Sequence, residues 1–308
     1  MSKKMDLQEY ELSQRLQIIE KYYDVDALLE GKIDNEVVEK YYRYTEFFYN
    51  WIHAGGSGAM HMGLSDDPFY SKEDLYKQAQ FVETLIDSPS IRVLELGGGQ
   101  LINTKYLAKK FPQNSFTALD LPNRGFLKKR VPKNVTLVEG DYNDLSVFPE
   151  NSFDIVFGVE TICYAADKKH VYEEIYKVLK PGGKLVIFDV YNMKHVEEMT
   201  DFEKRVCFLV WAATRLYSRD MCIGDMSKYL EELHYKDIEV TDLSMAVRPN
   251  LRRLDRISCY YFMHPRLMKF IRRFVADEVT MNSIVGWLTF FTTDGVRYHC
   301  YARIVATK

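Results

Sequence analysis

The feature that most constrains the fold is an alternation of segments that begins at Ile91. Short apolar runs are separated by segments with helical periodicity, and the apolar runs are IRVLEL, SFTALDL, VTLVEGD, FDIVFGVE and KLVIFDV. Continuous apolar strands that alternate with amphipathic helices are typical of a parallel sheet covered by helices on both faces. The alternation therefore predicts an α/β fold with a Rossmann-like, doubly wound and mostly parallel sheet.

The segments outside this alternation have helical patterns and few strand signals. We divide the chain into an N-terminal helical lid segment at 1–70 and a core at 71–308, with helical insertions near 191–225 and 248–287. A helix of the core is expected to begin at Ser71, whose hydroxyl can cap its first turn. No repeat or low-complexity linker separates these parts. One core with helical additions is therefore expected.

Charge and composition argue against several classes of protein. The 41 basic and 44 acidic residues give a net charge of −3, which does not favour nucleic acid as a partner. The N-terminus has no apolar signal core, and no apolar run reaches the roughly 18 residues of a membrane span. The five scattered cysteines indicate reduced thiols rather than disulfides or a metal site. We expect a cytoplasmic protein that binds a small molecule, and a homo-oligomer is left open.

A glycine-rich loop, VLELGGGQLI, follows the first apolar run. In an open α/β sheet, ligands bind beyond the carboxyl ends of the strands, which is where this loop is expected. The dinucleotide fingerprint G-x-G-x-x-G is incomplete, because its last position, counted from Gly97, is Ile102. The loop alone is also compatible with a tight turn that binds nothing.

Three successive strands each bring an acidic residue to this edge. Glu95 lies two residues before the first glycine, Asp120 ends the second strand, and Asp141 ends the third. Such an edge suits a ligand with a cationic amine, vicinal ribose hydroxyls and an adenine amino group, whereas a pyrophosphate would be repelled. S-adenosyl-L-methionine (SAM) carries an ammonium and a sulfonium. The acids therefore favour SAM and disfavour an NAD-dependent dehydrogenase.

Taken in order, the motifs VLELGGG, ALDLPN, VEGDYND, FDIVFGVE and VLKPGGKLVIFD resemble those of class I SAM-dependent methyltransferases. The resemblance runs from about Ser71 to Lys308 and implies the fold of that class with SAM as cofactor. It also implies contacts with the cofactor from Glu95, Gly97, Gly99, Asp120, Leu121, Asp141 and Tyr142. Of these, Glu95 and the glycines would hold the methionine portion, Asp120 the ribose, and Asp141 with Tyr142 the adenine. Leu101 departs from the pattern, since many members have a glycine there.

The segment GVETICYA resembles the sterol and terpenoid C-methyltransferases, which carry a glutamate at the position of Glu160. Methylation of an alkene carbon leaves a carbocation, which requires a base that removes a proton. A carboxyl group at the edge of an apolar pocket has a raised pKa and is a better base than one in water. Glu160 is therefore a candidate base, although an N-cap or an indirect contact with SAM is an alternative role.

Other motifs resemble different methyltransferases. ELGGG and ALDLPN are similar to plant-type O-methyltransferases, and many small-molecule N-methyltransferases have a glutamate after the fourth strand. For an oxygen or nitrogen nucleophile, His61 in the loop AMHMGL is an alternative base, because imidazole titrates near neutral pH. A SAM-binding subunit without catalytic activity is the non-enzymatic alternative.

The acceptor is expected to be a hydrophobic small molecule. Aromatic side chains can stabilise a carbocation, and the candidates for the pocket are Tyr44, Tyr49, Trp51 and Tyr164. The insertion near 248–287 is basic, and Arg252 is a candidate ligand of a phosphorylated or diphosphate-bearing substrate. The alternative for that insertion is a solvated helix face.

Overall fold

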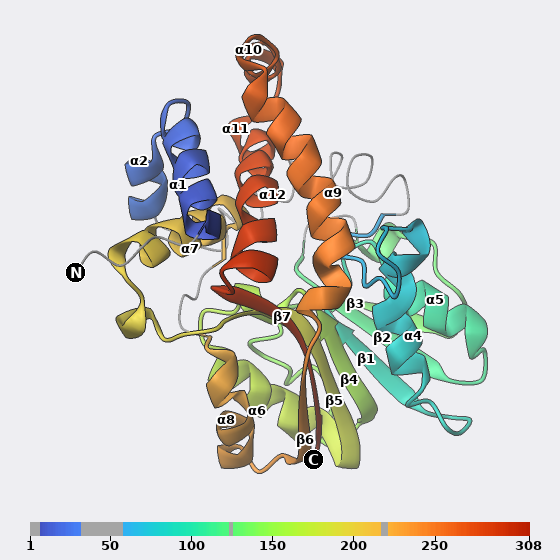
Figure 1. Cartoon of the computed structure of the whole chain (residues 1–308). Coiled ribbons are helices and arrows are strands. Elements are labelled where there is room, and N and C mark those ends of the chain that lie inside the picture. The colour runs from blue at the N-terminus through green and yellow to red at the C-terminus, as the bar shows by residue number, and fades with distance from the viewer. Residues whose placement is uncertain (1–6, 32–57, 123–125, 217–220) are drawn as a thin grey trace.

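The computed structural model describes residues 7–31, 58–122, 126–216 and 221–308. Its centre is a seven-stranded sheet with the order β3-β2-β1-β4-β5-β7-β6 (Figure 1). The strands are β1 (Arg92–Leu96), β2 (Ser115–Asp120), β3 (Val135–Glu139), β4 (Phe153–Val159), β5 (Leu179–Asn192), β6 (Lys236–Asp242) and β7 (His299–Thr307). Strands β1 to β5 pair in parallel, and β7 is antiparallel to both β5 and β6. The predicted Rossmann-like, mostly parallel sheet is confirmed.

The order of the strands reverses between β1 and β4. From β1 the chain builds outward through β2 and β3, then returns to place β4 on the other side of β1 and continues to β5. In the register of this pair, Leu94 lies opposite Val156 and Leu96 opposite Gly158. The crevice outside the carboxyl ends of two such strands is where doubly wound sheets bind ligands. The glycine loop, which follows β1, and Glu160, which follows β4, both lie at this crevice.

Alternating side chains of each strand supply two cores on opposite faces of the sheet. On one face Val93 and Phe157 pack with α4 (Lys77–Glu83), α5 (Ile102–Lys110) and the start of α9 (Ser244–Met263). On the other face Leu94 and Val156 pack with α6 (Lys168–Val178) and α8 (Met226–Glu232). The central parallel strands β1 and β4 are buried on both faces, which is why they are continuously apolar in sequence.

Side-chain caps mark the start of two helices, and the one at Ser71 was expected from the sequence. Ser71 caps the 3₁₀ turn η2 (Lys72–Tyr76) in a capping box with Asp74, and α4 follows directly. The Asp167 carboxylate accepts a hydrogen bond of 3.0 Å from the His170 amide at the start of α6. The remaining short 3₁₀ turns are η3 (Phe126–Lys128), η4 (Ile162–Tyr164), η5 (Val196–Glu198) and η6 (Ile223–Asp225).

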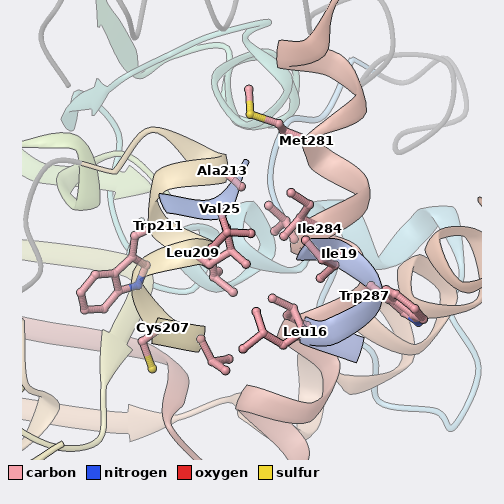
Figure 2. Close-up of a cluster of buried hydrophobic side chains, with 14 of the residues drawn as sticks. Leu16, Ile19, Val25, Cys207, Leu209, Trp211, Ala213, Met281, Ile284 and Trp287 are labelled. Atoms are coloured by element: carbon pink, nitrogen blue, oxygen red, sulfur yellow. The ribbon is translucent and has the colours of Figure 1, made fainter. Parts of the chain in front are cut away.

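A layer of helices covers the end of the sheet where the glycine loop lies (Figure 1). It comprises α1 (Leu7–Glu20), α2 (Val25–Glu30), α7 (Asp201–Thr214), α9, α10 (Pro265–Phe274), α11 (Asp277–Thr280) and α12 (Asn282–Phe290), which continues into the π-helical turn Phe291–Gly295. Figure 2 shows their shared core, in which Leu16 and Ile19 of α1 lie near Leu209 of α7 and Ile284 of α12.

The boundaries of the helical additions differ slightly from the sequence expectations. The late insertion begins at Ser244 rather than near 248, and α12 runs to Phe290 rather than 287. Helix α1 lies within the segment 1–70 that was expected to be helical, and its Leu12, Leu16 and Ile19 follow helical spacing and are buried. Among the described residues, none of the helices is both long and apolar enough to cross a membrane.

Candidate cofactor and active site

A pocket lies at the carboxyl ends of β1, β2 and β4. Its walls come from the glycine loop, the end of β2, the turn after β4 and the loop segment 58–61. Of the residues proposed from sequence, those that line it are His61, Glu95, Gly97, Gly99, Asp120, Leu121, Tyr142, Glu160 and Tyr164. Segments far apart in the chain thus meet at the strand-order reversal, where a ligand was expected.

The glycine loop requires residues without a side chain at two points. Gly97 and Gly99 have φ values of +66° and +49°, in the left-handed region that favours glycine. A Cβ atom on Gly97 would also overlap the Thr161 hydroxyl. Leu101, which stands in place of a third glycine, takes up a φ of +64° and is fully buried. The departure from the family pattern therefore keeps the backbone conformation that a glycine would supply.

Glu95 forms the floor of this loop. It is buried, and its carboxylate accepts hydrogen bonds from Asn103 Nδ2 at 3.1 Å and from the Thr104 amide at 3.2 Å, and another from the Thr104 hydroxyl. Burial raises the pKa of Glu95 to about 7, against the lowering effect of these donors. Glu95 thus ties the first turn of α5 to β1 while it lines the pocket.

Asp120 faces the pocket at the end of β2. Its two carboxylate oxygens accept hydrogen bonds from the Gly99 amide at 2.6 Å and from the Leu121 amide at 2.7 Å. These bonds hold the carboxylate beside the glycine loop. The sequence-based ribose ligand therefore lies next to the loop proposed to hold the methionine portion.

Asp141 is the one expected cofactor residue that does not line the pocket. Its carboxylate accepts hydrogen bonds from Asn143, from the amide at 2.9 Å and the side-chain nitrogen at 2.6 Å. The Asp141 carboxylate thus finds its hydrogen-bond donors within its own loop. The neighbouring Tyr142 does line the pocket, and its hydroxyl donates to the Thr161 carbonyl at 3.1 Å. The expected convergence of three carboxylates is corrected to Glu95 and Asp120, with Glu160 as a further acid of the same wall.

Glu160 projects from the turn after β4 with a φ of +49°, which is unusual for a residue with a side chain. Its amide donates to the Phe188 carbonyl at 2.7 Å, and its carboxyl group accepts a bond of 2.6 Å from the Met62 amide. The Tyr301 hydroxyl also donates to it. Burial, with the nearby Asp189 carboxyl, raises the pKa of Glu160 to about 8. A strained backbone and a shifted pKa at a pocket wall are features of functional sites.

His61 is the other candidate base. It is buried and lines the pocket, and its Nε2 lies 2.9 Å from the Leu75 carbonyl oxygen. A carbonyl only accepts, so Nε2 carries the proton in this contact. The hydrogen bond therefore fixes the ring orientation, which suits either a base or a structural loop residue.

Of the residues expected to bind the substrate, only some can be placed relative to the pocket. Tyr164 lines the pocket. Tyr44, Tyr49 and Trp51 lie outside the described residues. Arg252 is exposed on α9 and does not line the pocket, so its expected role beside the acceptor is not supported by its position.

Two residues beside Glu160 were missed from the sequence. Asp189, in β5, is fully buried and accepts hydrogen bonds from the amides of Cys163 at 2.8 Å and Val190 at 2.9 Å. Like the other acids, it follows an apolar strand run, and this signal could have identified it. Tyr301 had no such signal, because β7 is inserted between β5 and β6 and only this order brings it to Glu160.

A group of potential metal ligands also forms outside the pocket. Donor atoms of His195, Cys222 and Asp225 lie within 4.8 Å of one another. His195 Nε2 is 3.3 Å from an Asp225 oxygen, so a direct contact between these two side chains accounts for part of this arrangement. The sequence spacing had not indicated these three residues as a group.

The pocket fits SAM better than a dinucleotide. Among the described residues that line it there is no Lys or Arg, while Glu95, Asp120 and Glu160 are acidic. A pyrophosphate would lack a cationic partner there, whereas a sulfonium and an ammonium would find carboxyl groups. The open glycine loop leaves its backbone accessible to a ligand.

Comparisons with known proteins agree with this chemistry. Residues 94–187, from β1 to β5, match a family model described as "Methyltransferase domain". The segment that builds much of the pocket thus resembles a methyltransferase domain. The class and the SAM cofactor expected from the motifs are confirmed.

The chain is similar to a sterol 24-C-methyltransferase of Yarrowia lipolytica, with 24% identity over 70% of this chain and 60% of that protein. It thus spans less than two thirds of that relative's length. Among solved structures, the cyclopropane synthase MmaA2 from Mycobacterium tuberculosis has a TM-score of 0.70 at 12% identity, covering 90% of this chain and 99% of that one. Geranyl diphosphate C-methyltransferase from Streptomyces coelicolor A3(2) has a TM-score of 0.60 at 14% identity, with coverages of 90% and 99%. At these identities, the structures support the fold alone.

Proposed function

We propose that this methyltransferase transfers a methyl group from SAM to a carbon atom of a hydrophobic small molecule, of the terpenoid or sterol-like alkene class, with Glu160 as base. The observation that carries the proposal is the Glu160 carboxyl group on the wall of the cofactor pocket, where the Met62 amide donates a hydrogen bond to it. The name of one relative supports a carbon acceptor, since it is a sterol 24-C-methyltransferase. Cytoplasmic location is part of the same proposal.

Different residues of the pocket have different roles in the proposed reaction. The glycine loop and Asp120 hold the cofactor, whose chemistry is to supply an electrophilic methyl group on sulfur. The alkene supplies the electron pair of the new carbon–carbon bond, and the sulfur keeps the pair of the bond that breaks. Glu160 then takes a proton from the carbon next to the resulting cation, which restores a double bond. Hydrogen bonds from Met62 and Tyr301 hold its carboxyl group in place.

The runner-up is methyl transfer to oxygen or nitrogen. His61 favours it, because its ring lines the same pocket and its Nε2 contact with Leu75 fixes its orientation. A neutral imidazole could accept the proton of a phenol or an amine. This alternative differs from the first in its acceptor, so product analysis separates the two.

Glu160→Gln tests the role of the base. The amide keeps the shape and the oxygen that accepts from Met62 but cannot take a proton, so turnover should fall by roughly 10² to 10⁴-fold while SAM affinity changes little. The measurement is methyl transfer to a panel of terpenoids, sterols, phenols and amines, with mass spectrometry of the products and calorimetry of SAM binding. His61→Gln is the matched variant for the runner-up.

The outcomes distinguish the proposals. Carbon-methylated products that Glu160→Gln abolishes support the main proposal. Oxygen- or nitrogen-methylated products that depend on His61 support the runner-up. SAM binding without turnover of any acceptor in the panel would point to a non-catalytic SAM-binding subunit.

A further inference from the structure

The late helical insertion carries a row of exposed apolar side chains that no other part of the described chain covers. It runs along the end of α9 and the outer side of α10, and its members are Ile257, Tyr260, Met263, Leu267, Phe270 and Phe274. Phe270 and Phe274 are 63% and 71% exposed, and their ring centres are 5.1 Å apart. We call these six residues the hairpin stripe. Large aromatic side chains in such a group are seldom left in water without a partner.

The face of α10 that carries the stripe stays at the protein surface, because the opposite face of the same helix packs against the core. Met268 is buried on the inner side and Ile271 packs against the core shared with α1 and α12. Leu267, Phe270 and Phe274 follow the three-and-four spacing of one helix face, which therefore points outward. The stripe is thus a second apolar surface, separate from the core of the helical layer.

Basic side chains flank the stripe. Arg252, Arg256, Arg266, Lys269 and Arg273 are all exposed. Within the described residues, the ion pairs of this insertion join Arg248 to Asp294, Arg272 to Asp277 and Asp255 to Arg15, and no ion pair is found for Arg256, Lys269 or Arg273. On α10, Arg266, Lys269 and Arg273 lie beside the apolar face at helical spacing. The surface is therefore locally cationic on a chain whose net charge is −3.

The position of this surface separates it from the methyltransferase site. Helix α10 lies at the end of α9 that is farthest from the sheet (Figure 1). None of the residues of the stripe or its basic flank lines the pocket. The role in binding a substrate phosphate that was considered for this insertion from sequence would require such contact, so the position of these basic residues does not support that role.

We propose that the hairpin stripe and its basic flank dock this protein onto the surface of an anionic lipid bilayer. Aromatic and aliphatic side chains would enter the boundary between headgroups and acyl chains, and the arginines and lysine would meet lipid phosphates. A second copy of this chain is a poorer partner, because two stripes packed together would bring their basic flanks into contact. The proposal concerns attachment to one face of a bilayer and is independent of the reaction at the pocket.

Vesicle co-sedimentation with the full chain tests the proposal. At low salt, binding should be strong for vesicles of 70% phosphatidylcholine and 30% phosphatidylglycerol and weak for phosphatidylcholine alone. Lys269→Glu with Arg273→Glu, and separately Phe270→Ser with Phe274→Ser, should each weaken binding by at least about tenfold. Raising the salt concentration should weaken binding to the anionic vesicles.

Leu127→Ser is the matched control, since Leu127 is a 55% exposed apolar residue on η3, away from the insertion. All replaced side chains are exposed, so the melting temperatures should change little and losses of binding can be assigned to the surface. Equal binding of the original chain and both double variants would overturn the proposal. So would a dimer in light scattering that Phe270→Ser with Phe274→Ser converts to a monomer without any vesicle binding by the original chain. Neither measurement needs a methyl acceptor, so the result does not depend on the proposed function.

Discussion

At the scale of single residues, the pocket depends on unusual backbone conformations next to buried acids. Gly97, Gly99, Leu101 and Glu160 all have positive φ values. Each lies just after β1 or β4, where the chain must leave the sheet at once to form a ligand wall. Such conformations are held by their surroundings, as in the hydrogen bond from the Glu160 amide to Phe188. The chemistry of the site therefore rests on local geometry that few substitutions preserve.

Gly97→Ala should weaken SAM binding much more than it weakens the fold. A left-handed backbone costs alanine about 1–2 kcal/mol, and here the added Cβ also meets Thr161. Gly182→Ala is the matched control, because Gly182 has a φ of +79° but nothing within 4 Å of the added Cβ. We expect both variants to lose stability in urea unfolding, Gly97→Ala more than Gly182→Ala because of the contact with Thr161, and only Gly97→Ala to lose SAM affinity, by at least about tenfold. Equal SAM affinities would argue against the glycine loop as the cofactor wall.

The raised pKa of Glu160 predicts a specific pH dependence of stability. In the unfolded chain this carboxyl ionises near its ordinary value of 4.5, and in the folded chain near 8. Between these values the folded state keeps a proton that the unfolded state has released, so rising pH favours unfolding through this group. Glu160→Gln has no such proton, and its stability relative to the original chain should rise by roughly 1 kcal/mol per pH unit from pH 5 to 8.

Urea unfolding of both chains across this pH range measures the effect without an acceptor. A difference between the two free energies of unfolding that stays constant with pH would show that Glu160 ionises normally, which would weaken its case as the base.

At the scale of elements, helices distant in the sequence form one layer over the pocket end of the sheet. Helix α1 joins it through Leu12, Leu16 and Ile19, and Arg15 fixes its position. The Arg15 side chain donates to the Trp287 carbonyl on α12 at 2.7 Å and forms an ion pair with Asp255 on α9. The first helix of the chain is thus held by two of the last.

Leu12→Ala should destabilise the protein by about 2–5 kcal/mol, because Leu12 is fully buried between α1 and its neighbours and its loss leaves a cavity. Leu7→Ala, on the same helix, is the matched control, since Leu7 is 79% exposed and should change stability by no more than about 0.5 kcal/mol. Thermal or urea unfolding measures both. Similar small effects would mean that α1 is not packed as described.

At the scale of the whole molecule, the cofactor pocket lies where the two halves of the sheet meet. β1 and β4 supply its centre, β2 supplies Asp120, and the loop segment 58–61 closes one side. A ligand there contacts both halves and the N-terminal loop at once. Binding of a ligand in this pocket should therefore increase the free energy of unfolding of the whole protein.

SAM at a concentration 100 times its dissociation constant should stabilise the protein by about 2.7 kcal/mol and raise its melting temperature by roughly 5 °C. NAD at the same concentration should leave the melting temperature unchanged, because no Lys or Arg of the described pocket lining faces a pyrophosphate. Differential scanning fluorimetry makes the comparison. A shift with NAD that matches the shift with SAM would contradict the electrostatic argument.

Most of the fold and the cofactor loop could be predicted because their signals are local. The continuous apolar runs predict the parallel strands, and the glycines and acids at the ends of these runs indicate Glu95, Gly97, Gly99 and Asp120 as pocket residues. The segment 1–70 was expected to be helical, but the bounds of α1 within it could not be predicted, because its apolar face is stabilised by contacts with α7 and α12 rather than by its own sequence. Asp141 was expected to line the pocket but does not, because a carboxylate at the end of a strand can instead accept hydrogen bonds from residues of its own turn.

The sequence by itself determined the α/β class, the edge of the sheet that binds a ligand and the kind of ligand that its acids attract, because strand periodicity and residue charge are properties of short segments. Only the tertiary structure decided which side chains meet Glu160, since Met62 and Tyr301 come from segments 98 residues before it and 141 residues after it. It also decided that the basic insertion points away from the pocket. Such contacts depend on the order of the strands and the packing of helices, which no short segment encodes.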